Sequence, residues 1–329
     1  MTAKQADPSK NTVYILFEND GNHDILYRRD YNLDGCAIPY VNFREAIEKA
    51  GYRCKPTYDY VGLGSYTDVA YIISITLLRP EILQSVARHP KEKCFLFIQE
   101  PPTNYGYLYD ERLTNFFGKI FVMFDDMVDN QRYFKFFHPQ RNEKVVEETI
   151  AFEDKKFCVM IQSNHGDGSP KSIYGERRIA NAFFTEKGEF DLYGARWDGF
   201  SSWRGNYQKK CKKDLIKNYK FNLAYENMHD QYGYITERIF DAFYAKTVPV
   251  YLGPKNIYSY VPKECFINRA EFASYEDLYQ FMKGVDKTAY QNYIDAAQEF
   301  IKSPQAERFS SMEMARTISE HIVPANSEL

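Results

Sequence analysis

Residues 219–253, which read YKFNLAYENMHDQYGYITERIFDAFYAKTVPVYLG, form the stretch that decides the fold. The apolar run 221–225 has the composition of a buried strand, and a loop rich in Gly, Tyr and Asp follows it. Thr236 then opens a helix, because apolar residues recur at helical spacing through 239–244. The run 248–252 returns as a second strand. The stretch therefore predicts strand, loop, helix and strand in one compact unit.

Polar side chains follow the first strand of this unit and open its helix. In open α/β sheets, ligands bind outside the carboxyl ends of the strands, and helix N-termini attract phosphate groups. We therefore expect five residues to surround an anionic ligand: Glu226, Asn227, Tyr234, Glu237 and Arg238.

Composition places the chain among soluble globular proteins. It has 329 residues, enough for two domains of ordinary size, and its net charge of −3 gives no sign of a nucleic-acid partner. Six scattered cysteines without a Cys-x-x-Cys pair predict free thiols in a reducing compartment. The first eleven residues lack the apolar core of a signal peptide, and no apolar run is long enough to span a bilayer. We expect a soluble, cytoplasmic protein.

Strand-like and helical segments alternate in both halves of the chain. The N-terminal half has the expected strands 12–17, 53–58, 68–75, 94–99 and 119–124, with helices at 40–50 and 81–88. After a charged segment the pattern restarts, with strands at 157–163 and 190–193, a helix at 176–185 and final helices at 274–283, 287–302 and 305–321. Such alternation predicts α/β domains with parallel sheets. We place one domain at 1–150 and the other, with the terminal helices, at 151–329.

Other motifs carry weaker signals. The loop 164–172 lacks the ending of a P-loop, and 62–64 lacks the third glycine of a dinucleotide fingerprint. Asp125, Asp126 and Asp129 favour helix capping over metal binding, so no metal site is predicted. The segment 209–217 carries five lysines. We interpret it as a solvated face, with attraction to an acidic glycan or anionic lipid as the alternative.

Outside this stretch, charged residues also follow a predicted strand and open a predicted helix. Glu100 follows the strand 94–99 and precedes two prolines, which suits a general base, although strand ends often carry polar residues for no chemical reason. Arg177 and Arg178 open a helix against its dipole, which favours an anionic ligand as much as a surface salt bridge.

Three linked segments resemble the signature of the α-1,3-fucosyltransferases, glycosyltransferase family 10. They are YKFNLAYEN at 219–227, YITER at 234–238 and TVPVYLG at 247–253, in the family's order and near its spacing. Weaker similarity reaches 97–102, 157–194 and 203–205, and the first 90 residues hardly match. The resemblance to the bacterial, soluble members implies a GT-B fold, in which two Rossmann-like domains with parallel sheets face each other across a cleft.

The resemblance also implies roles for individual residues. Glu100 would be the general base that deprotonates the acceptor hydroxyl. Arg178 would contact the donor pyrophosphate, with Arg177 as the alternative, and Arg238 would neutralise it. Asn227, Tyr234 and Glu237 would line the nucleotide, with Glu226 and Lys220 as further donor-site residues of the same motif. Arg238 departs from the Lys usual in the family, and the loop between Asn227 and Tyr234 is a residue longer than in bacterial relatives.

The implied activity is inverting transfer of L-fucose from GDP-β-L-fucose to a GlcNAc or Glc hydroxyl of a glycan. The N-terminal domain would bind the acceptor and the C-terminal domain the donor. N-acetyllactosamine or lactose acceptors and an α-1,3 linkage are the family expectation, as in bacterial lipopolysaccharide that carries Lewis antigens. No cofactor is required, and a stimulatory Mn²⁺ or Mg²⁺ is left open, as is peripheral contact with the inner membrane or a lipid-linked glycan. Two alternatives remain: a GT-B transferase with another nucleotide-sugar, and a non-catalytic nucleotide-sugar- or glycan-binding protein.

Overall fold

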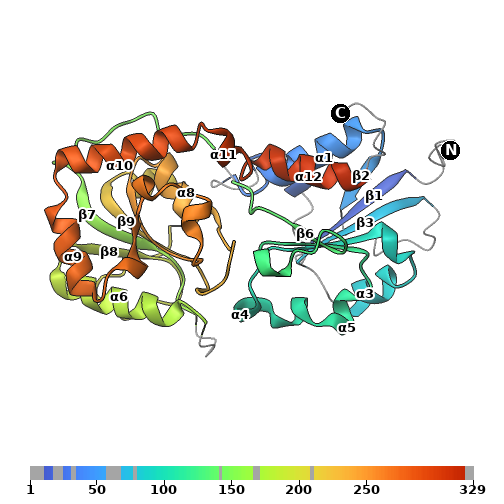
Figure 1. The fold of residues 1–329 in the computed structure, drawn as a ribbon, viewed down its shortest axis with the longest axis horizontal. Helices are drawn as coiled ribbons and strands as arrows, with labels where there is room; N and C mark the ends of the chain where they lie inside the picture. Colours follow the sequence, from blue (N-terminus) through green and yellow to red (C-terminus); the bar gives the residue numbers. More distant parts are fainter. Residues whose placement is uncertain are drawn as a thin grey trace. The chain divides into compact units, whose positions relative to one another are not determined.

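The computed structural model describes residues 11–17, 25–30, 35–56, 68–76, 80–140, 143–165, 171–207 and 211–322. The chain divides into two compact units (Figure 1). The first unit comprises Met1–Arg141 together with Ser311–Leu329, and the second comprises Asn142–Ser310.

The first unit contains a six-stranded parallel sheet in the order β2-β1-β3-β4-β5-β6. Its strands are β1 (Thr12–Phe17), β2 (Arg53–Pro56), β3 (Val69–Ile75), β4 (Cys94–Ile98), β5 (Lys119–Val122) and β6 (Tyr133–Lys135). Runs such as CFLFI in β4 are apolar at every position and buried at every position. This pattern is typical of parallel strands, because helices cover both faces of their sheet. The predicted parallel sheet is therefore confirmed.

Helices cover both faces of this sheet. Figure 1 shows α1 (Ile38–Lys49) and α12 (Ser311–Ile322) on one side, with α3 (Pro80–Val86), α4 (Pro102–Tyr105) and α5 (Glu111–Thr114) on the other. Asp125–Met127 form a short 3-10 turn, and the Asp129 carboxylate accepts from the backbone N–H groups of residues 131–133. Asp129 therefore caps a turn that leads into β6, not the helix that the sequence predicts, and Asp125 pairs with Lys135 at 2.6 Å.

The last helix departs from the expected domain division. Residues 305–321 are expected as one helix of the second domain, but the structure has α11 (Pro304–Glu307) and a separate α12. α12 packs along α1 in the first unit, where Asn42 Nδ2 donates to Ser311 Oγ at 2.9 Å in a buried contact. Packing against a distant segment thus overrides sequence proximity, and the first unit is built from both ends of the chain.

The imidazole of His321 holds the end of α12 in place. Because this imidazole can be protonated, the stability of the contact depends on pH. Its Nδ1 lies 2.9 Å from Lys119 Nζ, and its ring packs on Phe121 and Phe134. Burial, followed by the charge of Lys119, lowers the pKa of His321 to about 4. Since the unfolded histidine has a pKa near 6.5, the unfolded chain takes up the proton first as the pH falls. The stability that neutral His321 contributes is therefore complete above about pH 6.5 and is lost towards pH 4.

We expect α12 to loosen on acidification by about 2 kcal/mol between pH 7 and pH 4.5. Hydrogen exchange of the α12 amides, corrected for intrinsic rates, measures this opening. In His321→Asn, which cannot titrate in this range, the pH dependence should largely disappear. Equal acid sensitivity in the two proteins would show that another group controls the helix.

The second unit contains a five-stranded parallel sheet in the order β11-β10-β9-β7-β8. Its strands are β7 (Lys156–Ile161), β8 (Phe190–Tyr193), β9 (Tyr219–Tyr225), β10 (Val248–Leu252) and β11 (Ile267–Asn268). The strand order reverses between β7 and β9, which makes their carboxyl ends the topological switch point where ligands bind in such sheets. The predicted strand, helix and strand of 219–253 are confirmed as β9, α8 (Glu237–Tyr244) and β10.

The helices of the second unit fix the two faces of this sheet. One face packs α6 (Tyr174–Lys187), α9 (Tyr275–Gly284) and α10 (Lys287–Phe300) around Cys158 and Met160 of β7. The other face packs α7 (Lys212–Ile216) and the end of α8 against Val159 and Ile161. Alternate residues of β7 therefore point into two cores, and its carboxyl end is held on both sides.

Candidate functional site

Side chains join the carboxyl ends of β7 and β9 at the switch point. Gln162 Nε2 donates to the Tyr225 carbonyl at 2.7 Å. Arg177, from the first turns of α6, donates through Nη2 to the carbonyls of Tyr225 and Glu226 at 3.0 and 2.7 Å. Only 2 % of Arg177 is exposed, so its guanidinium holds the chain after β9 from within.

The Glu226 carboxylate is the buried centre of the site, with no exposed surface. It accepts from the Thr236 backbone N–H and hydroxyl at 2.8 and 2.7 Å, from the Tyr251 hydroxyl at 3.0 Å and from Arg238 Nη1 at 3.0 Å. Burial raises the pKa of Glu226, and Arg238 and the Thr236 N–H oppose that shift. A carboxylate with so many donors is a buried charge that the fold has satisfied, and it fixes the start of α8.

Two guanidinium groups converge on the Asn227 side chain. Arg177 Nη2 and Arg238 Nη2 donate to Asn227 Oδ1 at 2.9 and 3.0 Å. Burial, followed by the charge of Arg238, lowers the pKa of Arg177. Two cations so close together are held at an electrostatic cost, which an anion bound beside them would relieve.

Arginine at position 238 has a geometric role that lysine could not fill. Its Nη1 reaches Glu226 Oε2 and Thr236 Oγ1, the latter at 2.7 Å, while its Nη2 reaches Asn227. A planar fork can bind two sides at once, whereas an ammonium is a single point of charge. Arg238 is thus a cation that is tied to both Glu226 and Asn227.

Tyr234 and Glu237 flank this cluster from inside the unit. Only 1 % of Tyr234 and 8 % of Glu237 are exposed. Glu237 Oε1 lies 3.6 Å from Lys212 Nζ, an ion pair with α7. The structure therefore brings Tyr234 and Glu237 to the same loop and helix start as Glu226, Asn227 and Arg238.

Two expected donor-site residues lie apart from the cluster. Arg178 is exposed and donates through Nη1 to Asn164 Oδ1 and the His165 carbonyl, each at 3.2 Å. Arg177, the alternative, is the one that reaches Asn227, because adjacent helix residues point about 100° apart. Lys220 stands at the amino end of β9, where its Nζ lies 3.8 Å from the centre of the Phe152 ring.

Glu100 lies in the first unit, two residues after β4. Its Oε2 accepts from Asn104 Nδ2 at 3.0 Å, and its carbonyl accepts from the Tyr109 hydroxyl at 2.8 Å. The adjacent Gln99 accepts from the Tyr40 hydroxyl at 2.8 Å. Glu100 is therefore a partly exposed carboxylate held by a neighbouring amide at the carboxyl end of a parallel strand, where a base is useful.

A pocket of about 400 Å³ opens beside the carboxyl ends of β10 and β11. It is lined by Glu176 of α6, by His229 and Asp230 of the loop after β9, and by Lys255, Asn268 and Arg269. Glu176 and Arg269 were not predicted from the sequence. Their charges are visible there, but nothing in the sequence indicates that α6 meets the chain after β11.

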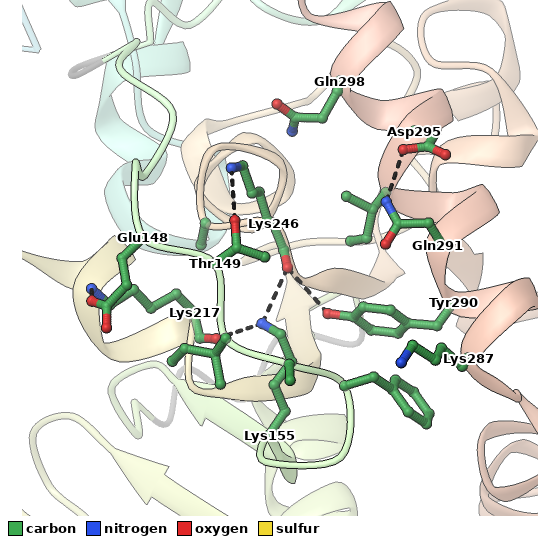
Figure 2. A pocket seen from close by; sticks show the side chains of 15 residues that line it. Glu148, Thr149, Lys155, Lys217, Lys246, Lys287, Tyr290, Gln291, Asp295 and Gln298 are labelled. Carbon is green, nitrogen blue, oxygen red and sulfur yellow. Dashed lines mark hydrogen bonds and ion pairs between the residues drawn. The ribbon is translucent and has the colours of Figure 1, made fainter.

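Another pocket, of about 410 Å³, lies at the opposite, amino ends of the strands (Figure 2). Four lysines line it: Lys155, Lys217, Lys246 and Lys287. Lys217 pairs with Glu148 at 2.6 Å, and Lys287 pairs with Glu153 at 3.1 Å. Lys155 is buried and donates to the carbonyls of Lys217 and Lys246 at 2.5 and 3.3 Å. Lys155 thus ties a helix end to a turn, and this pocket is separate from the cluster around Asn227.

Lys155 makes the unfolding free energy of the second unit depend on pH in the alkaline range. Burial, followed by the charges of Lys217 and Lys246, lowers the pKa of Lys155 to about 8 from an ordinary 10.5. Between those values the unfolded chain holds the proton more tightly, so stability rises with pH in this window. Relative to Lys155→Met, the wild type should gain about 2 kcal/mol of unfolding free energy between pH 8 and pH 10. Urea unfolding at the two pH values measures the gain, and a constant difference would contradict it.

The lysines of the segment 209–217 are interpreted above as a solvated face, and the described ones serve the fold instead. Lys212 pairs with Asp241 at 2.7 Å, and Lys213 is buried against the Lys144 carbonyl. Residues 209 and 210 lie outside the described residues, as do the glycine motif 62–64 and most of the loop 164–172.

The described residues also bear on metals and membranes. Among them, no three His, Cys, Asp or Glu side chains are grouped so that they could hold a metal ion. None of the described helices has the length and apolarity needed to cross a membrane.

Comparison with solved structures defines the class of the fold. An α-1,3-fucosyltransferase with GDP-fucose superimposes with a TM-score of 0.59 at 13% identity, covering 99% of this chain and 94% of that one. The DNA-modifying enzyme β-glucosyltransferase superimposes with a TM-score of 0.56 at 12% identity, covering 94% and 99%. Two parallel-sheet α/β units of this kind define the GT-B class of glycosyltransferase folds, as expected.

The sequence comparisons identify the family of the matched domain. Residues 155–318 match the model described as "Glycosyltransferase family 10 (fucosyltransferase) C-term". This part of the chain is therefore a glycosyltransferase family 10 domain. Similar relatives include the α-(1,3)-fucosyltransferase FucT of Helicobacter pylori, 34% identical over 77 residues, and the 4-galactosyl-N-acetylglucosaminide 3-α-L-fucosyltransferase 9 of Cricetulus griseus, 38% identical over 157 residues. The matches cover 23% and 46% of this chain and span only 16% and 39% of those relatives.

Proposed function

We propose that this protein is an inverting fucosyltransferase that moves L-fucose from GDP-β-L-fucose to a GlcNAc or Glc hydroxyl of a glycan. The observation that carries the proposal is the convergence of Arg177 and Arg238 on Asn227 at the switch point of a family 10 domain. Such a site offers fixed positive charge where the pyrophosphate of a nucleotide-sugar would lie.

The donor half of the reaction requires stabilisation of a departing diphosphate. As the bond between the fucose anomeric carbon and the phosphate oxygen breaks, its electron pair leaves with GDP. The guanidinium of Arg238 would neutralise this charge at the surface of the cluster, since its side chain is 20% exposed. Arg177 is buried beneath it and would act by holding Asn227 and the chain after β9 in place.

The acceptor half requires a base. The acceptor hydroxyl oxygen would attack the anomeric carbon from the side opposite GDP, and its proton would pass to the Glu100 carboxylate. Asn104 orients that carboxylate through its bond to Oε2, and a positioned base contributes typically about 10²–10⁴-fold to the rate. Attack opposite the leaving group converts the β-linked donor into an α-linked product.

The test is a transfer assay with GDP-fucose over lactose, N-acetyllactosamine and its type 1 isomer, with the linkage read by NMR. We expect an α-1,3 linkage on lactose or N-acetyllactosamine. A parallel thermal-shift panel of nucleotides should show stabilisation by GDP alone. Stabilisation by another nucleotide would indicate a GT-B transferase with a different donor. Stabilisation by GDP without transfer or donor hydrolysis would indicate a binding protein.

A further inference from the structure

The pocket beside β10 and β11 contains a carboxylate and a guanidinium held next to each other. Glu176 Oε2 accepts from the Tyr275 hydroxyl at 2.8 Å and lies 4.0 Å from Arg269 Nη2. The Arg269 guanidinium lies 4.2 Å from the centre of the Tyr275 ring, and its Nη1 donates to the Phe272 carbonyl at 2.8 Å. Tyr275 thus supports both side chains, which fixes their positions without tying up the carboxylate completely.

Each of the two charged groups keeps hydrogen-bonding capacity. Within the part of the chain that the structure describes, Glu176 Oε1 has no hydrogen bond, and the Glu176 side chain is 37% exposed. The Arg269 side chain is only 13% exposed, and its Nη2 lies 4.0 Å from Glu176 Oε2, which is too far for a hydrogen bond. Buried polar groups in folded proteins are normally paired, so this pocket has acceptors and donors that a ligand could use.

The pocket adjoins the cluster that would hold the pyrophosphate. Glu176 immediately precedes Arg177, and the pocket residues His229 and Asp230 follow Asn227 by two and three positions. Ile173, at the start of α6, donates its backbone N–H to the Asn227 carbonyl at 3.1 Å. A nucleoside attached to a pyrophosphate at Asn227 would therefore have this pocket within reach.

We propose that Glu176 and Arg269 select guanine as the base of the donor nucleotide, an inference that rests on the function proposed above. Guanine presents two neighbouring donors, N1–H and the N2 amine, beside the acceptor O6. A carboxylate accepts from the two donors, and a guanidinium donates to O6. Uracil has one N–H between two carbonyl oxygens, and adenine has an acceptor in place of N1–H, so neither base matches this pair.

The other carboxylate that lines the pocket does not offer this combination. Asp230 is bound by Lys255 at 3.2 Å and by His229 at 2.8 Å, so its two carboxylate oxygens both have cationic or imidazole partners. Glu176 and Arg269 are therefore the lining pair whose chemistry suits a donor–donor–acceptor edge.

Calorimetric titration of the full chain with GDP, IDP and UDP tests the proposal. IDP keeps O6 and N1–H but lacks the N2 amine, so it isolates one of the contacts assigned to Glu176. The wild type should bind GDP about 10-fold more tightly than IDP and about 100-fold more tightly than UDP. In Glu176→Gln, which can keep the bond from Tyr275, GDP affinity should fall about 10-fold or more and the GDP-to-IDP ratio should approach 1.

Two further variants complete the design. Arg269→Lys should weaken GDP and IDP equally, because both bases carry O6. Glu186→Gln, an exposed carboxylate on the same helix, should leave all three affinities unchanged.

The outcomes separate the two proposals. A wild type that binds another nucleotide more tightly than GDP, or binds none, overturns the proposed function. A wild type that prefers GDP, together with a Glu176→Gln variant that keeps the full GDP-to-IDP ratio, overturns the role of Glu176 and leaves the proposed function standing. Denaturation midpoints of each variant identify any loss that comes from unfolding. If Glu176→Gln does not fold, the Arg269→Lys variant is decisive. Unchanged affinity of that variant for GDP and IDP overturns the proposal that Glu176 and Arg269 select guanine.

Discussion

We expect Glu100→Gln to lower kcat/KM for the proposed fucosyl transfer by about 10²–10⁴-fold, while GDP should bind with unchanged affinity. The amide keeps the size of the carboxylate and can still accept a hydrogen bond from Asn104, but it cannot take the proton of the acceptor hydroxyl. GDP binding should survive because the proposed donor residues belong to the second unit. Initial rates with GDP-fucose and N-acetyllactosamine, with GDP affinity from calorimetry, measure the two quantities.

The matched control for Glu100 is a carboxylate at the other end of the same strand. Glu92 is exposed and precedes β4, whereas Glu100 follows it, so Glu92→Gln should keep wild-type turnover. The pH profile adds a signature that a structural role would not produce, since removal of the base should also remove the acid limb of kcat/KM. Near-normal turnover in Glu100→Gln, or loss of GDP binding, would exclude Glu100 as the base.

Arg177→Met and Arg178→Met should have opposite outcomes although the residues are adjacent. Arg177→Met removes the guanidinium that donates to the carbonyls of Tyr225 and Glu226 and to Asn227 Oδ1. These buried acceptors then lose their hydrogen bonds from Arg177. We expect a loss of about 3 kcal/mol in unfolding free energy and of about 100-fold in GDP affinity. Arg178→Met removes only exposed hydrogen bonds to residues 164 and 165. The unfolding free energy should therefore change by less than about 0.5 kcal/mol, and GDP affinity should stay within about twofold of the wild type.

Calorimetry with GDP and chemical denaturation of both variants decide between the two arginines. Arg177→Lys separates charge from geometry, because lysine keeps the charge but not the planar fork. We expect it to recover stability only in part. If Arg178→Met loses GDP and Arg177→Met keeps it, the pyrophosphate contact belongs to the exposed arginine and Arg177 is solely structural.

Much of the second unit could be predicted from its sequence because local signals agree with the fold there. The runs 221–225 and 248–252 are continuously apolar, as parallel strands require, and the helix between them has a clear apolar stripe. The grouping of Glu226, Asn227 and Arg238 follows from the end of a strand and the start of a helix, both of which the sequence marks. Their direct contacts in the structure agree with that expectation.

Features that depend on one-residue rotation or on distant packing could not be predicted. Arg177 and Arg178 are equally charged, and only the orientation of α6 turns the first inward. Lys220 belongs to the signature segment, yet it stands at the far end of β9, about 16 Å of strand from Tyr225. The pairing of Glu176 with Arg269 joins segments more than ninety positions apart, and no periodicity records such a contact.

The return of α12 to the first unit sets the order in which the chain can be completed. Ribosomal synthesis supplies Asn142–Ser310 as one uninterrupted piece, so every strand and helix of the second unit exists before Ser311 is made. The first unit lacks the helix that packs along α1 until Ser311–Ile322 is made. The usual N-terminal-first succession is therefore reversed for this unit, because α12 completes the packing around a sheet whose strands were synthesised much earlier.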